Sequence, residues 1–184
     1  FYRPGRGPAS RRPREPRHAA LAEVRDRLAE VSDTILNIRV GGNDLSHAFG
    51  LRRPGDRTIY DLGPVAAILL DIVTAFGTEY VVSGPVWEYY AGPGWEEGLR
   101  RELELDLLNG FTGKTVIHPS QIPVVNEMLR VSSRDYADAR SILNWDKDGL
   151  VAASRDGERM NEYNTHYNWA RRIVLRAERY GTKP

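Results

Sequence analysis

The sequence predicts an α/β fold in which parallel strands are connected by crossover helices. Three apolar segments that suit strands, 34–40, 79–86 and 114–119, alternate with segments whose apolar residues recur at helical spacing. The gaps between these segments leave room for a helix in each connection, as parallel strands require. A loop with glycine, proline or polar side chains follows each strand segment. This repeated order is typical of a parallel sheet covered by helices.

The elements before the second strand follow from the spacing of apolar residues. A helix is predicted over 18–33, where apolar side chains recur every three or four positions: Leu21, Val24, Leu28 and Val31. The first strand, 34–40, comes next. A loop over 41–57 follows it, with a short helical turn expected at its centre. A second, largely buried helix is predicted over 60–77, and Gly77 suits its C-terminal cap.

The elements after the second strand are predicted in the same way. An amphipathic helix spans 94–110 and ends at Gly110, and the third strand, 114–119, follows. The segment 149–160 resembles a hairpin with an Asp156-Gly157 turn. Three further helices are predicted from their apolar spacing: 121–130, 133–148 and 166–181.

The composition excludes several classes of protein. With 184 residues, 41% hydrophobic and 28% charged, the chain suits one globular domain with a real core. No apolar run approaches the ~18 residues of a membrane span, so no membrane role is expected. There is no cysteine, which excludes disulfides, thiolate metal sites and cysteine nucleophiles. The absence of cysteine is compatible with a reducing cytoplasm.

A basic segment at 1–18 opens the chain, with six arginines against the single acid Glu15. One interpretation is contact with nucleic acid or a membrane. The interpretation we favour is a disordered arm, because arginine and proline are too frequent for packing. The arm has no interleaved aromatic residues and the rest of the chain has no basic stripe, so nucleic acid is not an expected partner.

The segment "GFTGKTVIHPSQI" contains G-x-x-G-K-T, which suggests a phosphate-binding loop. Such a loop follows a strand, and its Lys-Thr pair begins a helix. Here the order is reversed, because a helix precedes Gly110 and Lys114-Thr115 begin an apolar strand. The full motif also requires glycine at position 108, which is Leu108. We therefore interpret the glycines as turn residues that lead into a strand ending at His118-Pro119.

Polar residues follow all three strands, at the ends that would meet at one edge of a parallel sheet. Gly41-Gly42 allow close approach, and their amides suit an anionic carboxylate. Asp44 offers a hard oxygen ligand for a divalent cation. Glu88 follows the second strand, and His118 ends the third. Each residue alone is more typical of a turn or a structural role, but together they predict a ligand-binding edge.

Several segments resemble a known superfamily, that of the citrate lyase beta-subunit and the 2-keto-3-deoxy sugar-acid aldolases. "RVGGNDLSHAFG" is similar to its metal-binding loop, and "NGFTGKTVIHPSQIPVVNE" to the Gly-Lys-x-x-Ile-His-Pro-x-Gln segment of the citrate lyase-like branch. "RTIYD", "GPVWE" and "THYNWARRIVLRAERYG" bring the sequence closest to the carbon–carbon bond lyase TIM-barrel proteins associated with tellurium-resistance gene clusters. The resemblance covers roughly residues 20–181.

The resemblance implies a (β/α)8 TIM barrel that uses Mg²⁺ or another divalent cation. The metal would polarise a 2-keto acid or acyl-thioester substrate during aldol-type cleavage or condensation. Asp44 matches the family's metal aspartate. The family's second metal ligand, a glutamate that ends the preceding strand, has no match, nor has its substrate arginine. The candidate substrate-binding residues are Gly42, Asn43, Lys114 and His118.

The domain organisation is predicted from the number of strands. A closed barrel has eight strands and ~250 residues, whereas three strands are predicted here and resemble the sixth to eighth. We expect the C-terminal part of a TIM barrel in three regions: a basic arm at 1–18, a partial barrel at 19–130 and a helical C-terminal extension at 131–184. The chain would then be a truncated form of a barrel enzyme.

Two functions remain open from the sequence. The first is a metal-dependent carbon–carbon bond lyase whose substrate is a small carboxylate or a thioester. The second is a non-catalytic partial barrel that serves as an interaction module. Aromatic residues of the extension predict a buried surface, which either packs within the chain or forms a homo-oligomer: Trp145, Tyr163, Tyr167 and Trp169.

Overall fold

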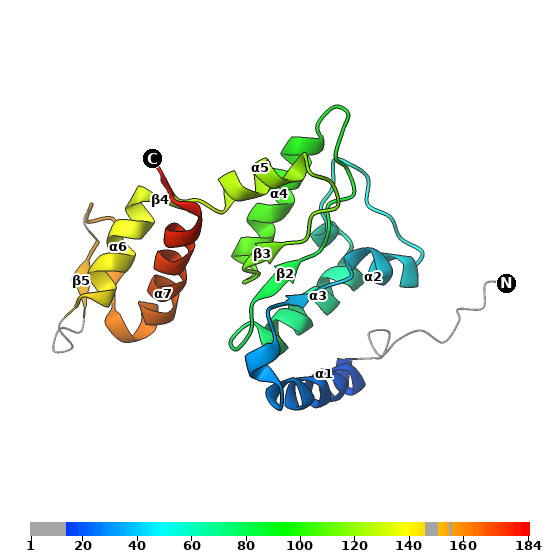
Figure 1. The fold of residues 1–184 in the computed structure, drawn as a ribbon, viewed down its shortest axis with the longest axis horizontal. Helices are drawn as coiled ribbons and strands as arrows, with labels where there is room; N and C mark the ends of the chain where they lie inside the picture. Colours follow the sequence, from blue (N-terminus) through cyan, green and yellow to red (C-terminus); the bar gives the residue numbers. More distant parts are fainter. Residues whose placement is uncertain (1–13, 146–150, 155) are drawn as a thin grey trace. The chain divides into compact units, whose positions relative to one another are not determined.

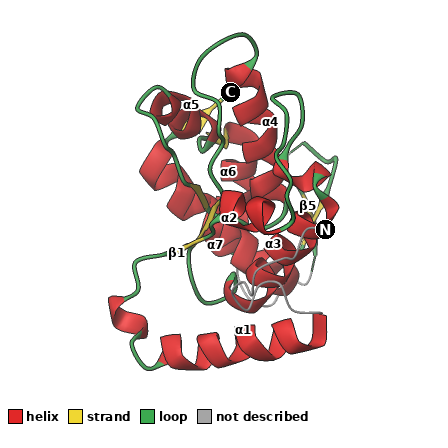
Figure 2. Ribbon diagram, turned by 90° about the vertical axis from the view of Figure 1, so that its right-hand side faces the viewer, coloured by secondary structure: helices red, strands yellow, loops and turns green. Residues whose placement is uncertain are grey.

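The computed structural model describes residues 14–145, 151–154 and 156–184 (Figure 1). They divide into two compact units, Phe1–Val125 and Asn126–Pro184, and each unit has its own hydrophobic core. The regular structure is mostly helical (Figure 2). Within the described ranges, no helix is long and apolar enough to cross a membrane.

A three-stranded parallel sheet lies at the centre of the first unit. Its strands, in the order β1-β2-β3, are β1 (Ile38–Arg39), β2 (Val82–Gly84) and β3 (Gly113–Lys114). Ile38 pairs with Val82, and Gly84 with Lys114. This confirms that the three predicted strands are parallel neighbours, and the described strands close no barrel.

The strands are shorter than their apolar segments suggested. Pro85 follows β2 directly and has no N–H to continue the ladder. After β1 the chain enters a helix at Gly42, and β3 starts one residue earlier than predicted and ends at Lys114. His118 therefore lies in the loop after β3, four residues beyond the last strand residue, and not at the end of a strand.

Helices connect the strands of this sheet in the order that the sequence predicts. Gly110, with φ of 95°, ends the α4 segment as expected. The α-helices are α1 (Arg14–Ala29), α2 (Gly42–Ala48), α3 (Gly63–Phe76), α4 (Trp95–Leu108) and α5 (Gln121–Met128), and the 3₁₀ turns are η2 (Ser32–Thr34) and η3 (Ile59–Asp61).

The first helix begins earlier than predicted, at Arg14 instead of residue 18. Two residues of the predicted basic arm contact Asp71 of α3: Arg17 forms an ion pair with it, and Nε2 of His18 lies 3.2 Å from its Oδ1. Residues 14–18 are thus helical, with Pro16 in the first turn, where proline is tolerated. Residues 1–13 of the predicted arm lie outside the described residues.

The core of the first unit is built between α3 and the sheet. Residues of α3 at helical spacing are buried together with apolar residues in and next to the strands, while Leu21 and Leu28 of α1 pack against the same cluster. The members are Val40, Leu45, Ile59, Val65, Ile68, Leu69, Phe76, Val82 and Phe111. Burial of each large side chain contributes roughly 1.5–3 kcal/mol, so this cluster fixes the sheet against α3.

The second unit is a pair of helices, α6 (Ser133–Leu143) and α7 (Tyr163–Tyr180). Their core includes Ile142, Ala170 and Ile173, and Trp145 and Trp169 pack against it within the chain. The predicted hairpin is confirmed, with Gly157 at a φ of 73° in its turn. The strands of this unit are β4 (Val131–Ser132), β5 (Ala152–Ala153), β6 (Met160–Asn161) and β7 (Thr182–Lys183).

Candidate active-site edge

The carboxyl ends of β1, β2 and β3 lie at one edge of the sheet, because all three strands run in the same direction. The loops that leave this edge carry most of the polar residues that the sequence singled out. Asp44 follows β1, Glu88 follows β2 and His118 follows β3. In barrels of parallel strands this edge is the one that holds the chemistry.

The two glycines after β1 allow close packing against the loop after β2. A Cβ on Gly42 would collide with Cβ of Pro85 and would lie 2.7 Å from Cδ1 of Ile59. Gly41 precedes α2, and a side chain there would collide with the carboxylate of Asp44. The close approach expected of these glycines is therefore made to the protein's own residues.

Asn43 and Asp44 lie in the first turn of α2, and both are exposed. The sequence predicts a loop over 41–57 with a short helical turn at its centre, but the helix begins directly after Gly41. A carboxylate in a first helical turn is favoured by the dipole of the peptide groups. Asp44 is thus held at the carboxyl edge of the sheet with its side chain open to solvent.

His118 lies against Tyr90, so that the loops after β2 and β3 meet. The two rings are stacked, with centroids 4.4 Å apart and an interplanar angle of 16°. Ser120 bridges the pair, since its Oγ lies 2.9 Å from Nδ1 of His118 and donates to the carbonyl oxygen of Tyr90 at 3.1 Å. His118 and Tyr90 are both exposed. They form a polar aromatic surface on the candidate edge.

Gln121 connects the same two loops from beneath and was not singled out as a site residue from the sequence. Its side chain is fully buried. Nε2 donates to the carbonyl oxygens of Trp87 and Tyr89, each at 2.9 Å, while Oε1 accepts the N–H of Ile117 at 3.0 Å. One amide thus satisfies three backbone groups, and it fixes the loop after β2 against the loop after β3.

Lys114 occupies a different place from the other candidate residues. Its side chain is completely buried, and Nζ lies 2.8 Å from Oε1 of Glu102 and 2.7 Å from Oδ2 of Asp106. Both acids belong to α4 and are themselves fully buried. Tyr60 completes one side of the group by donating to Oδ1 of Asp106 at 2.7 Å. We call Lys114, Glu102, Asp106, Tyr60 and Arg53 the buried charge network.

Arg53 joins this network to the loop after β2. Its Nε lies 3.1 Å from Oε2 of Glu102, and its guanidinium donates to the carbonyl oxygen of Val86. The same group lies over the ring of Trp87 at 5.2 Å, although Nε and Nη1 have no aligned hydrogen-bond acceptor. Glu102 also accepts the backbone N–H of Ile59 at 2.8 Å. The network therefore joins α4 and β3 to the loops after β1 and β2.

The electrostatics of the network follow from its burial. Loss of hydration raises the pKa of Asp106, and the neighbouring Lys114 amine opposes that rise. Burial and the adjacent Asp106 carboxylate raise the pKa of the Tyr60 hydroxyl, which keeps it a hydrogen-bond donor. Two cations face two carboxylates in this enclosed space, so the charges are matched without a ligand.

The fit of a divalent cation can be tested on the acids of the candidate edge. Glu88 is mostly buried, and its Oε2 accepts from Nε of Arg52 at 2.9 Å. No group of three or more acidic or histidine side chains that could hold a metal occurs in the described ranges. Asp44 therefore provides one exposed ligand and not a preformed metal site.

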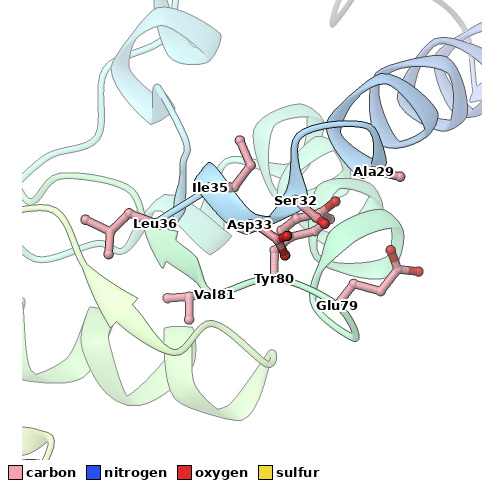
Figure 3. A pocket seen from close by; sticks show the side chains of 8 residues that line it. All are labelled: Ala29, Ser32, Asp33, Ile35, Leu36, Glu79, Tyr80 and Val81. Carbon is pink, nitrogen blue, oxygen red and sulfur yellow. The ribbon is translucent and has the colours of Figure 1, made fainter.

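A pocket of about 400 Å³ lies elsewhere, beside the amino ends of β1 and β2 (Figure 3). Its polar lining comes from Ser32, Asp33, Glu79 and Tyr80. Because this is the edge opposite to the one that carries Asp44 and His118, we do not assign the chemistry to it.

The parallel strands, the helices between them and the polar carboxyl edge together define an α/β protein of the TIM-barrel class. Comparison with known families identifies the particular one. The chain belongs to the carbon–carbon bond lyases of the TIM-barrel fold, which it matches over residues 11–182.

Two curated relatives that match this chain share the name (3S)-malyl-CoA thioesterase. A (3S)-malyl-CoA thioesterase of Cereibacter sphaeroides is 31% identical over 143 residues, which are 76% of this chain and 47% of the relative. The thioesterase of the same name from another strain is 37% identical over 87 residues, 45% of this chain and 30% of the relative. The chain thus spans about half the length, or less, of the curated relatives it matches.

Proposed function

We propose that this protein takes part in carbon–carbon bond cleavage or formation on a short acid or its acyl-CoA thioester. Its membership of the carbon–carbon bond lyase family supports the reaction type. The single structural observation that carries the proposal is the position of Asp44. It is an exposed carboxylate in the first turn after a parallel strand, at the edge where the loops carrying Glu88 and His118 also emerge.

The chain's own residues have distinct parts in this proposal. Asp44 supplies one oxygen ligand to Mg²⁺ or another divalent cation, which, when bound, would polarise a substrate carbonyl. Gly42 and Asn43 place the backbone next to that ligand. His118, with an exposed imidazole, faces the reaction volume from the loop after β3 and contacts the substrate. Gln121 positions His118 and does not itself touch the substrate.

We propose a structural role for Lys114 in place of the substrate-binding role that the resemblance implied. Both neighbouring carboxylates bind its amine, and no part of its side chain is exposed. We propose that Lys114 supports the edge by holding β3 to α4. Contact with substrate would require the amine to leave two buried carboxylates, which costs several kcal/mol.

The proposed substrate is a 3-hydroxyacyl-CoA thioester with a free carboxylate, by analogy with the name of the relatives. Two reactions are distinguished by their products. Carbon–carbon cleavage of (3S)-malyl-CoA gives acetyl-CoA and glyoxylate without water, whereas hydrolysis consumes one water and gives malate and free CoA. Mass spectrometry of the products, with Mg²⁺ present, separates the two.

The test compares the wild-type chain with Asp44→Asn and with Asp56→Asn. Asp56 is a suitable control because its side chain is 76% exposed and lies in the same connection between β1 and α3. We expect cleavage products from the wild type and from Asp56→Asn, and at least ~100-fold slower formation from Asp44→Asn. Malate and CoA as the only products would replace the lyase proposal by a thioesterase.

A second function, a non-catalytic binding module, is favoured by one observation. The buried charge network satisfies Lys114 completely within the protein, as a structural element would. Under this alternative no acyl-CoA turns over, although acids still bind at the edge. Product analysis together with a binding measurement separates the two functions.

A further inference from the structure

Arg39 is a charged residue of the central sheet that has no ion-pair partner among the described residues. It lies in β1 and is exposed, and no carboxylate within the described ranges forms an ion pair with it. It is the only charged residue of β1, two positions before Gly41. A free guanidinium this close to the candidate edge has five N–H donors in a planar fork, a geometry that matches an oxyanion.

The direction of Arg39 follows from its neighbours along β1. Ile38 and Val40 both pack in the core beneath the sheet, against α3. Side chains alternate between the two faces of a strand, so Arg39 points to the opposite face. Within the described ranges the side chain of Arg39 forms no hydrogen bond or ion pair, and it is exposed. The guanidinium is thus available to a ligand.

The residues beside Arg39 on that face are small. Arg39 is the register partner of Ser83 in β2, and Ser83 is paired in turn with Gly113 in β3. A Cβ built on Gly113 would lie 3.1 Å from Oγ of Ser83, which places both on one face. Gly84 and Lys114 lie on the other face, where a Cβ on Gly84 would collide with the Asp106 carboxylate and the Lys114 amine pairs with it. Arginine, serine and glycine therefore lie in a row across the three strands.

Thr115, the residue that follows β3, carries a hydroxyl without a hydrogen-bond partner among the described residues. Thr115 continues the ladder, because its N–H donates to the carbonyl oxygen of Gly84 at 3.0 Å. Its residue is 9% exposed, and Oγ1 is enclosed without a hydrogen-bond partner in the described structure. Since Lys114 faces α4, alternation places Thr115 on the same face as Ser83. Buried hydroxyls without partners are uncommon, and a ligand would satisfy this one.

We propose that Arg39, with Ser83 and Thr115, forms a carboxylate-binding subsite on the face of the sheet opposite to α3, where Arg39 is exposed and the two hydroxyl residues are buried. Its ligand is the free carboxylate of a short acid. One guanidinium with two hydroxyls matches the single charge and two oxygens of a carboxylate. A phosphate is more often held by several cations or by a row of backbone amides. The role of the bound carboxylate in turnover rests on the proposed function, whereas the binding of a carboxylate at Arg39 does not.

The subsite would determine which acids the protein prefers as substrates. A substrate that carries a carboxylate apart from its reacting carbonyl would be anchored on Arg39, while Asp44 lies further along the chain from the same strand. Substrates without that second carboxylate would lose the anchor. The protein would therefore prefer a thioester of a dicarboxylic acid to one of a simple fatty acid.

The experiment measures binding without turnover. Malonate is the probe, since it has the two carboxylates of a short diacid but neither a thioester nor a hydroxyl group to react. Calorimetry gives its affinity, and NMR follows the Arg39 Nε–H signal, identified by its loss in Arg39→Gln. The matched control is Arg101→Gln, which removes an exposed arginine of α4. Thermal melting confirms that each variant is folded.

We expect malonate to shift the Arg39 signal saturably and to bind Arg39→Gln about tenfold or more weakly, as loss of a charge-assisted pair predicts. Arg101→Gln should bind as the wild type does, and Arg39→Lys should bind at an intermediate level because it keeps the charge and loses the fork. Equal affinity of wild type and Arg39→Gln overturns the proposal. Inorganic phosphate that binds as tightly as malonate overturns the assignment to carboxylates.

The outcome is separable from that of the proposed function. Malonate binding at Arg39 with no turnover of (3S)-malyl-CoA would remove the lyase proposal and leave the subsite. Turnover that is unchanged in Arg39→Gln, with no malonate binding, would remove the subsite and leave the lyase.

Discussion

Nζ of Lys114 lies 2.7 Å from Oδ2 of Asp106, and neither side chain has any exposed surface. The amine also binds Glu102, one helical turn away on the same face of α4. The pair joins the last strand of the sheet to the helix that precedes it. Charges enclosed in this way stabilise the fold only while all partners are present, because a lone buried charge has lost its hydration.

Replacement of Lys114 by Met is therefore expected to destabilise the first unit by about 3–5 kcal/mol, the cost of leaving buried carboxylates without their cation. Urea denaturation measures the loss. Arg27→Met is the control, since Arg27 pairs with Glu23 at the surface and its loss should cost less than about 0.5 kcal/mol. The double variant Lys114→Met/Asp106→Leu should recover part of the stability. A loss below about 1 kcal/mol for Lys114→Met would contradict a structural role for the network.

Gln121→Met should disturb the candidate edge more than the rest of the fold. The substitution keeps the volume but leaves the carbonyl oxygens of Trp87 and Tyr89 and the N–H of Ile117 without their partner. We expect a stability loss of about 1–3 kcal/mol and weaker stacking of His118 on Tyr90. NMR detects the stacking through the ring-current shift of the His118 protons.

Val124→Ala is the control for Gln121, because Val124 is buried in the same helix and its truncation should lower stability. It should leave the His118 signals near their original positions. If both variants shift those signals equally, the loops respond to general loosening of α5 and Gln121 has no specific positioning role.

The attachment of α1 to α3 is expected to weaken in acid. Burial tends to raise the pKa of Asp71, but hydrogen bonds from His18 and Arg17 outweigh it and hold the pKa below its usual value of 3.8. A pKa that is lower in the folded state adds stability above the unfolded value, and that stability is lost as pH falls through the folded value. The free energy of unfolding of wild type should thus exceed that of Asp71→Asn at pH 6 by about 1–3 kcal/mol.

This difference should shrink as the pH falls from 3.8 through the lower pKa of Asp71 in the folded state. Denaturation of both proteins between pH 6 and pH 2.5 gives the comparison. Asp26→Asn, at a largely exposed position of α1, should show almost no difference at any of these pH values. A gap between wild type and Asp71→Asn that stays constant across the range would refute the link.

Divalent cation binding should be weak and should depend on Asp44. Mg²⁺ is usually held by one or two carboxylates together with waters and substrate oxygens, and Asp44 is a single ligand. We expect titration calorimetry to give a millimolar or weaker affinity, which disappears in Asp44→Ala and persists in Glu88→Gln. Tight binding that survives Asp44→Ala would place the metal elsewhere.

The order and direction of the strands could be predicted from the sequence because they depend on local patterns. Apolar segments separated by predicted helices indicate parallel strands, and β1, β2 and β3 are parallel neighbours in the sheet as expected. The strand lengths could not be predicted in the same way. They depend on where hydrogen bonds stop, as at Pro85, and not on how far the apolar pattern extends.

The position of individual site residues was predictable only in part. Asp44 follows β1 as its place after an apolar segment indicated, whereas His118, predicted to end the third strand, lies in the loop after β3. The partners of Lys114 could not be read from its own segment, since Glu102 and Asp106 lie 12 and 8 positions away, in α4. A local signal did exist for α4. Glu102 and Asp106 share a helical face with the buried Leu99 and Leu103, a spacing that indicates enclosed acids.

The lack of space at Gly42 limits how this protein can change by mutation. Any side chain there would have to displace Pro85 and Ile59 together, and these belong to two different connections. The route to new specificities therefore runs through neighbouring positions such as Asn43, where a side chain is free to vary without moving the backbone. A library that randomises the connection between β1 and α3 should keep glycine at position 42 and vary the exposed positions beside it.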